Sequence, residues 1–78
     1  MYNLYTIPIC PDCKALKVRL NESEIEFEER NILEDKWRLD GYRFGKLKAP
    51  FIVFVDENGF EQVLEDSQIE KILKKELL

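Results

Sequence analysis

The chain of 78 residues contains no histidine and only two cysteines, Cys10 and Cys13. A tetrahedral zinc site takes four nitrogen or sulfur ligands, so these absences argue against a zinc site built within one copy of the chain. A metal or iron–sulfur cluster shared by two copies is one alternative, because four thiolates form a legitimate ligand set.

Positive charge and long apolar segments are also scarce. Twelve lysines and arginines face sixteen aspartates and glutamates, which gives a formal net charge of −4 and argues against a nucleic-acid partner. The first residues carry no basic segment followed by an apolar one, and no window approaches the roughly 20 apolar residues of a membrane span. We therefore expect a cytoplasmic protein without a membrane partner, folded as a single domain over residues 1–78.

Cys10 and Cys13 are the most informative feature, because they stand between an apolar strand pattern and an amphipathic helix pattern. A helix that starts just after Cys10 places the first thiol at its N-terminus and Cys13 one turn further in, close enough to form a disulfide. In a reducing compartment such a pair is expected to cycle between its dithiol and disulfide forms. The pattern therefore favours thiol–disulfide exchange over a structural clip.

The rest of the chain predicts an α/β fold with the element order β-α-β-α-β-β-α. Alternating or continuous apolar patterns predict strands over residues 2–7, 25–32, 51–55 and 60–64, and helical spacing predicts helices over 11–21, 33–42 and 67–77. Asn58-Gly59 is the strongest signal for a tight turn between the last two strands. Since a helix connects the first two strands, they should be parallel neighbours in a four-stranded mixed sheet with the three helices on both faces.

Single residues refine these helices. Pro11 suits a first helical position, where its missing N–H costs no hydrogen bond. Gly41 either ends the second helix or marks a close packing contact, and Trp37 is expected at the core or its rim. Ser67 and Glu70 predict a capping box at the start of the last helix. The apolar stripe of that helix consists of Ile69, Ile72, Leu73 and Leu77.

With these motifs in place, the chain resembles the glutaredoxins, the minimal form of the thioredoxin fold, over essentially its whole length. The resemblance is carried by Tyr5-Thr6 ahead of residues 10–17, by residues 27–32, and by Ala49-Pro50 before the third strand. It implies a cis Ala49–Pro50 bond beside the sulfurs, and it implies that Ala49 offers its backbone N–H and C=O to an extended glutathione or peptide. The substrate contacts implied in this way are Pro11, Asp12, Ala49, Pro50, Asp66 and Ser67.

The chain departs from the glutathione-using members of that family at three places. Asp12 stands where these members carry an aromatic residue, residues 6–9 lack their lysine, and Leu64-Glu65 replaces their Gly-Gly pair. Residues 41–43 are similar to glutaredoxin-like proteins that supply electrons to ribonucleotide reductase. The resemblance thus implies a monomer with no bound cofactor, which receives electrons from glutathione or a thioredoxin-reductase-type flavoprotein. The implied acceptors are disulfide-containing proteins, ribonucleotide reductase among them.

Within the pair, Cys10 is expected to be the nucleophile, because helix N-terminal N–H groups favour its thiolate, and Cys13 is expected to resolve the mixed disulfide. We expect Asp12 to disfavour that thiolate and the cations Lys14 and Lys17 to favour it. The net expectation is a more strongly reducing couple than that of an aromatic-containing motif.

Lys46 and Lys48 stand just before Pro50 and are either solvated surface lysines or a means of attracting a partner's carboxylate. Besides the shared metal, the alternative to an oxidoreductase is a thioredoxin-fold binding module without catalytic activity.

Overall fold

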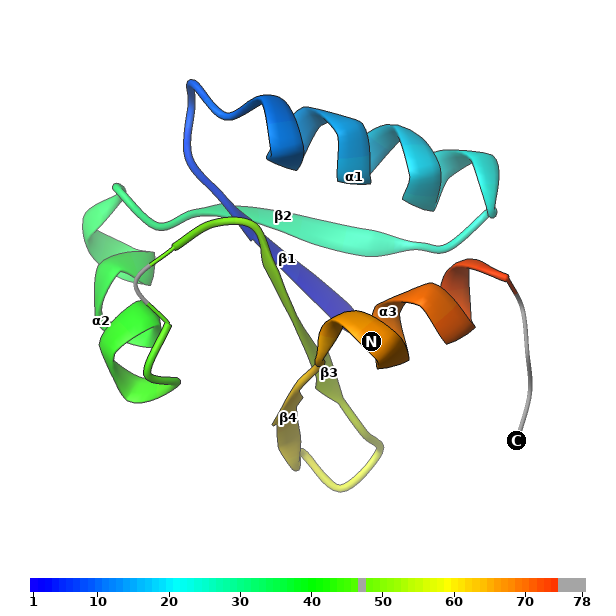
Figure 1. Ribbon diagram of the computed structural model, residues 1–78. Helices are drawn as coiled ribbons and strands as arrows, with labels where there is room; N and C mark the ends of the chain where they lie inside the picture. The colour runs from blue at the N-terminus through cyan, green and yellow to red at the C-terminus, as the bar shows by residue number, and fades with distance from the viewer. Residues whose placement is uncertain (47, 75–78) are drawn as a thin grey trace.

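The computed structural model describes residues 1–46 and 48–74 (Figure 1). The strands are β1 (Tyr2–Thr6), β2 (Phe27–Asn31), β3 (Phe51–Val55) and β4 (Glu61–Val63), and the helices are α1 (Pro11–Glu22), α2 (Asp35–Arg43) and α3 (Asp66–Leu73). This order is the predicted one. Within these residues, no helix has both the length and the apolar character needed to cross a membrane.

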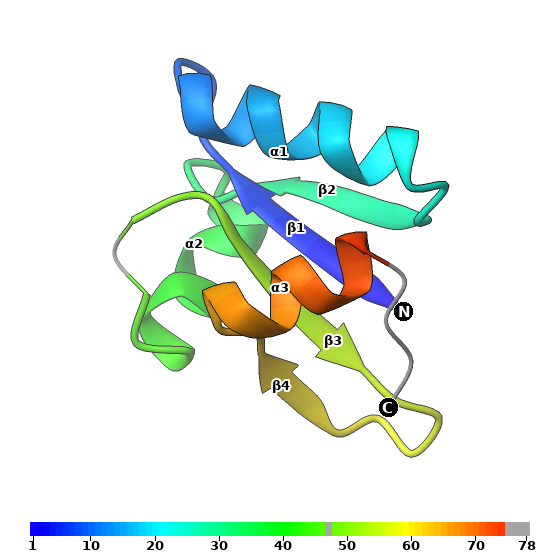
Figure 2. The same ribbon diagram turned by 45° about the vertical axis from the view of Figure 1, so that its right-hand side comes forward.

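The four strands form one mixed sheet in the order β2-β1-β3-β4. β1 pairs in parallel with β2 and antiparallel with β3, and β3 pairs antiparallel with β4 (Figure 2). The parallel strands β1 and β2 are connected through α1, as the sequence predicts. The antiparallel strands β3 and β4 are connected through the turn at residues 56–60. In that turn the Asp56 carboxylate accepts the N–H groups of Asn58 and Phe60, and Gly59 takes a φ of +85°.

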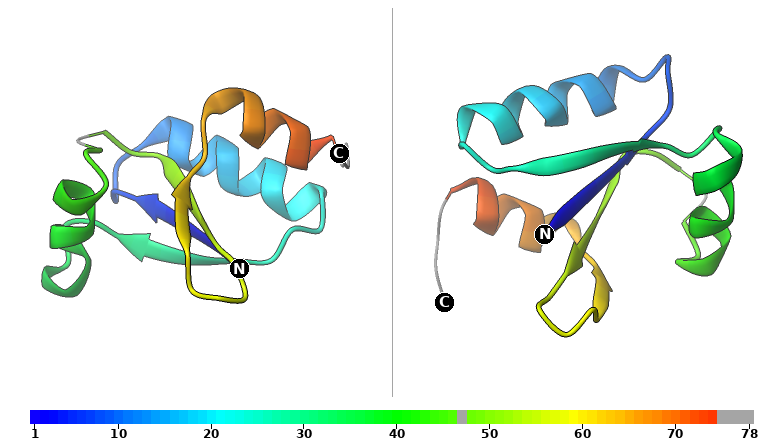
Figure 3. Two further views of the ribbon diagram at one scale, coloured as in Figure 1. Left: turned by 90° about the horizontal axis from the view of Figure 1, so that it is seen from below. Right: turned by 180° about the vertical axis from the view of Figure 1, so that it is seen from behind.

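Helices cover both faces of the sheet, with α1 and α3 on one face and α2 on the other (Figure 3). Successive side chains of a strand point to opposite faces, so Leu4 and Tyr5 of β1 belong to different cores. The core under α1 and α3 consists of Leu4, Leu20, Ile52, Ile69 and Leu73. The core on the α2 side is built on Tyr5, Phe51 and Val53. Leu20 thus packs α1 onto the first of these two cores.

The predicted start of α3 is wrong. The helix begins at Asp66 with Glu65 as its N-cap, and the Glu65 N–H donates to Oε1 of Gln68 at 2.8 Å. Ser67 and Glu70 form no capping box, because Ser67 lies inside the helix. The Glu70 carboxylate instead accepts two hydrogen bonds from Arg19 of α1, each at 2.8 Å. The part of the predicted helix that contains Leu77 lies outside the described residues.

Gly41 marks a close packing contact rather than the end of α2. The residue is buried inside the helix, and a Cβ added there would lie 3.1 Å from the carbonyl oxygen of Lys46. The Lys46 N–H donates to the Gly41 carbonyl at 2.8 Å, so the chain folds back tightly against the helix. The reversal itself uses Gly45, whose φ of +67° is unfavourable for other residues.

Strand β2 is shorter than the alternation around it predicts. Glu24 takes a φ of +58° in the reversal after α1, and the strand starts only at Phe27. Within the strand Glu28 and Glu29 are both exposed, so the burial does not alternate cleanly. An edge strand is covered by a neighbour on one side alone, which explains why charged residues are tolerated at both positions.

A polar network connects α2 to the sheet around the buried hydroxyl of Tyr5. This hydroxyl donates to Asp40 Oδ2 at 2.7 Å and accepts from Arg30 Nη1 at 2.9 Å. The Tyr5 ring stacks on Phe51 with 4.6 Å between centroids, and the Arg30 guanidinium lies 4.1 Å from the Trp37 ring centroid. Burial, and next the hydrogen bond to Asp40, raise the pKa of Tyr5 to about 12, so the hydroxyl remains a donor at neutral pH.

We expect Tyr5→Phe to lower the free energy of unfolding by about 1–3 kcal/mol, because it leaves Asp40 and Arg30 each without one partner in a partly buried place. Urea denaturation at neutral pH measures the change. Tyr42→Phe is the matched control, since that side chain is 68% exposed and the substitution is expected to change stability by less than about 0.5 kcal/mol. Equal midpoints for the two variants would contradict a stabilising role of the network.

Candidate functional site

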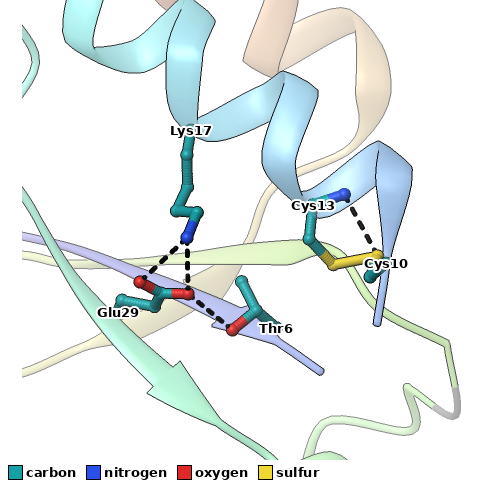
Figure 4. The surroundings of a disulfide bond; sticks show 5 residues. All are labelled: Thr6, Cys10, Cys13, Lys17 and Glu29. Carbon is teal, nitrogen blue, oxygen red and sulfur yellow. Dashed lines mark hydrogen bonds and ion pairs between the residues drawn. A yellow bond between two sulfur atoms is a disulfide. The ribbon is translucent and has the colours of Figure 1, made fainter. Parts of the chain in front are cut away.

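The two cysteines lie at the N-terminal end of α1. Cys10 is the N-cap residue, with an extended backbone at φ −151° and ψ 98°, and Pro11 is the first helical residue. This is the start that Pro11 predicts, because no N–H is needed there. Cys10 and Cys13 form a disulfide with their Cα atoms 5.2 Å apart (Figure 4).

The two sulfurs have different surroundings. Cys13 is 2% exposed, whereas Cys10 is half-buried, and the Cys13 N–H donates to the Cys10 Sγ at 3.1 Å. A free backbone N–H at a helix N-terminus and the helix dipole both stabilise negative charge on a sulfur that lies there. Once the disulfide is reduced, this arrangement suits Cys10 to be the attacking thiolate and Cys13 to be the enclosed resolving thiol.

A groove of about 810 Å³ surrounds the disulfide. Its lining comes from the connection after β1, from the first turns of α1, from β2 and from the N-cap of α2. Thr6 at one side of it is 3% exposed, and Ile9, next to Cys10 in the chain, is 91% exposed. The groove residues are Thr6, Ile7, Pro8, Ile9, Cys10, Pro11, Cys13, Lys14, Lys17, Glu29, Asn31 and Glu34.

Glu29 is the groove residue that the sequence analysis missed. Its carboxylate accepts a hydrogen bond from the Thr6 hydroxyl at 2.9 Å and pairs with the Lys17 ammonium at 3.2 Å (Figure 4). Lys17, which the sequence analysis expects to favour the Cys10 thiolate, thus has a counter-charge in Glu29. The parallel pairing of β1 and β2 is the available signal, because it places Glu29 opposite Leu4, in the middle of β1 and two residues before Thr6.

A second hollow, of about 430 Å³, lies between the residues before β3 and the start of α3. It is lined by Pro50 and Asp66 together with the exposed lysines Lys46 and Lys48. The Ala49–Pro50 bond is cis, as the resemblance implies.

The residues expected to contact substrate are thus distributed over several places. Pro11 lines the disulfide groove, and Pro50 and Asp66 line the second hollow. Asp12 is exposed on the first turn of α1, Ser67 is exposed on the first turn of α3, and Ala49 is half-buried. Among residues 1–46 and 48–74, no three acidic or cysteine side chains are grouped so that they could hold a metal ion.

The fold and the cysteine pair define a thioredoxin-fold protein with a C-x-x-C disulfide. The family model of the glutaredoxins matches residues 3–60. An uncharacterized glutaredoxin-like 8.6 kDa protein in the rubredoxin operon of Clostridium pasteurianum is 32% identical over 75 residues, which cover 91% of this chain and 100% of that protein. The chain belongs to the glutaredoxin family.

Two further similarities extend this result. The global transcriptional regulator Spx of Enterococcus faecalis is 36% identical over 64 residues, which cover 82% of this chain but only 43% of the regulator. This chain therefore matches less than half of that protein's length. The crystal structure of the thioredoxin-like protein BC3987 superimposes with a TM-score of 0.70 at 26% identity, covering 95% of this chain and 97% of that one. A mutant of BC3987 gives a TM-score of 0.69 at 25% identity.

We expect Cys10 to react at least about tenfold faster than Cys13 with iodoacetamide in the reduced protein, because Cys10 is more accessible and its thiolate is stabilised at the helix N-terminus. Peptide mass spectrometry after short exposure at neutral pH measures the two rates. In the Cys10→Ser control the remaining thiol should keep its slow rate. Similar rates for both cysteines in the wild type would contradict the assignment of roles.

Proposed function

We propose that this chain is a dithiol oxidoreductase that reduces disulfides in partner proteins through Cys10 and Cys13. The observation that supports the proposal most strongly is the arrangement of the two sulfurs: Cys10 accepts the Cys13 N–H at 3.1 Å, and Cys13 is 2% exposed directly beside it. Membership of the glutaredoxin family supports the same chemistry.

In the proposed reaction the Cys10 thiolate attacks one sulfur of the partner's disulfide, and the other partner sulfur leaves as a thiolate. Cys13 then loses its proton to solvent and attacks the Cys10 sulfur, so the Cys10–Cys13 disulfide forms and the second partner thiolate leaves. The partner gains two electrons and the cysteine pair loses two. A dithiol donor restores the pair by the reverse exchange.

For the electron donor we propose a thioredoxin-reductase-type flavoprotein rather than glutathione. The start of α3, where the family holds a glutathione carboxylate, carries the exposed carboxylates of Glu65 and Asp66. Two negative charges there disfavour a third, even though a helix N-terminus by itself favours an anion. As acceptors we propose cytoplasmic proteins with accessible disulfides, and ribonucleotide reductase is the first to test.

The test is NADPH oxidation with a protein disulfide as acceptor, run in parallel with thioredoxin reductase and with glutathione plus glutathione reductase. We expect turnover with thioredoxin reductase and at most a small fraction of that rate with glutathione. Cys10→Ser should abolish turnover with either donor, since no nucleophile remains. Efficient turnover with glutathione would overturn the proposed donor, and no turnover with either would overturn the oxidoreductase itself.

A redox-responsive regulator is the second candidate, because a relative named as a global transcriptional regulator matches 82% of this chain. In that case the Cys10–Cys13 disulfide would act as a signal, and its formation would change binding to a partner without repeated turnover. Absence of turnover in both coupled assays, combined with a partner interaction that differs between the reduced and oxidised chain, would favour this candidate.

A further inference from the structure

The ion pair between Lys17 and Glu29 joins the helix that carries both cysteines to the edge strand of the sheet. Lys17 Nζ lies 3.2 Å from Oε2 and 3.3 Å from Oε1 of Glu29. The Thr6 hydroxyl, 3% exposed, donates to the same carboxylate at 2.9 Å. Three contacts from two other elements thus fix the position of the Glu29 carboxylate.

This pair lines the same groove as the two sulfurs. Lys17 is four residues after Cys13 in α1, so the two side chains point from the same face of the helix, one turn apart. Figure 4 shows the Lys17 side chain extending from that face toward Glu29, beside the disulfide. Both members of the pair line the groove that contains Cys10 and Cys13.

Charged side chains line the groove from α1, from β2 and from the N-cap of α2. Lys14 and Lys17 come from α1, Glu29 comes from β2, and Glu34 comes from the N-cap of α2. Asp12 stands on the first turn of α1, outside the lining. An ammonium whose counter-charge lies 3.2 Å away produces a much weaker field at a nearby sulfur than an ammonium alone, because the two contributions largely cancel.

We propose that Glu29 is a positioning residue that sets the ionisation of Cys10 by holding Lys17 in a neutral pair beside the disulfide. The inference rests on the proposed function, since it concerns how readily Cys10 attacks a disulfide. With Glu29 in place, the favourable effect of Lys17 on the Cys10 thiolate is largely cancelled. Cys10 is then less acidic than an unpaired Lys17 in the same groove would make it, which suits a reductant.

A purely mechanical role predicts a different outcome. The side chains of Lys17 and Glu29 are 37% and 42% exposed, and ion pairs at such exposure add little to stability. If the pair were only a clamp on α1, removal of either member would affect Cys10 in the same direction. If the pair sets the charge near Cys10, removal of the two members has opposite effects.

The test compares Glu29→Gln, Lys17→Met and the double variant with the wild type. In the reduced proteins, the rate of Cys10 alkylation as a function of pH gives the apparent pKa of that thiol. Glu29→Gln keeps an acceptor for Thr6 and leaves the Lys17 charge unbalanced, so we expect a lower pKa and about two- to threefold faster alkylation below it. Lys17→Met leaves the Glu29 carboxylate without its counter-charge and should slow alkylation by a similar factor. In the double variant the alkylation rate should return close to that of the wild type.

A matched control and a second readout complete the design. Glu28→Gln removes one negative charge from the neighbouring position of β2, where the carboxylate pairs with Arg30 at 2.6 Å outside the groove. It should leave alkylation of Cys10 unchanged. Equilibration with glutathione redox buffers should show Glu29→Gln as more oxidising and Lys17→Met as more reducing than the wild type, because a more stable thiolate stabilises the reduced form.

Shifts of the same sign in Glu29→Gln and Lys17→Met, a double variant that does not return to the wild-type value, or an equal shift in Glu28→Gln would each overturn the proposal. Alkylation needs neither an electron donor nor a protein acceptor. A wild type that fails to reduce protein disulfides would therefore refute the proposed function, while the alkylation rates would still decide the role of Glu29 on their own.

Discussion

The hydrogen bond from the Cys13 N–H to the Cys10 sulfur, at 3.1 Å, is the interaction on which the chemistry proposed for this chain depends. It exists because α1 starts at Pro11, which makes Cys10 the N-cap. The same start brings Cys13 into the buried layer one turn later and points Lys17 along the same side of the helix. A helix that started one residue earlier or later would change the exposure of both sulfurs together, so the roles proposed for the two cysteines depend on one helix boundary.

The two faces of the sheet hold this site by different means. Under α1 and α3 the contacts are apolar, and Leu20 of α1 is fully buried in that layer. On the α2 side, the Tyr5 hydroxyl binds Asp40 and Arg30 while its ring stacks on Phe51. Phe51 directly follows the cis Ala49–Pro50 bond, so the polar network also fixes the place where β3 begins. One face therefore positions the cysteines, and the other positions the proline segment.

Electrostatics near the cysteines cannot be derived from neighbours in sequence alone. Counting the charges next to the pair suggests that Lys14 and Lys17 act together against Asp12. The fold gives Lys17 a partner, Glu29, that is twelve residues away along the chain. Glu70 shows the same effect. Local spacing predicts that its side chain caps α3, but in the fold its carboxylate accepts hydrogen bonds from Arg19 of α1. Charged side chains are long, and they pair with whatever opposite charge packing brings within reach.

By itself the sequence determined the order of the elements, the hairpin at Asn58-Gly59, the start of α1 and the position of Cys10 and Cys13 at that start. Each of these follows from residues within a few positions of one another, where propensity and periodicity act. Only the tertiary structure decided that Glu29 lies in the disulfide groove and that Gly41 packs against the carbonyl of Lys46. These contacts depend on strand register and on how helices dock, and both are set by burial of the whole apolar surface at once rather than by any local pattern.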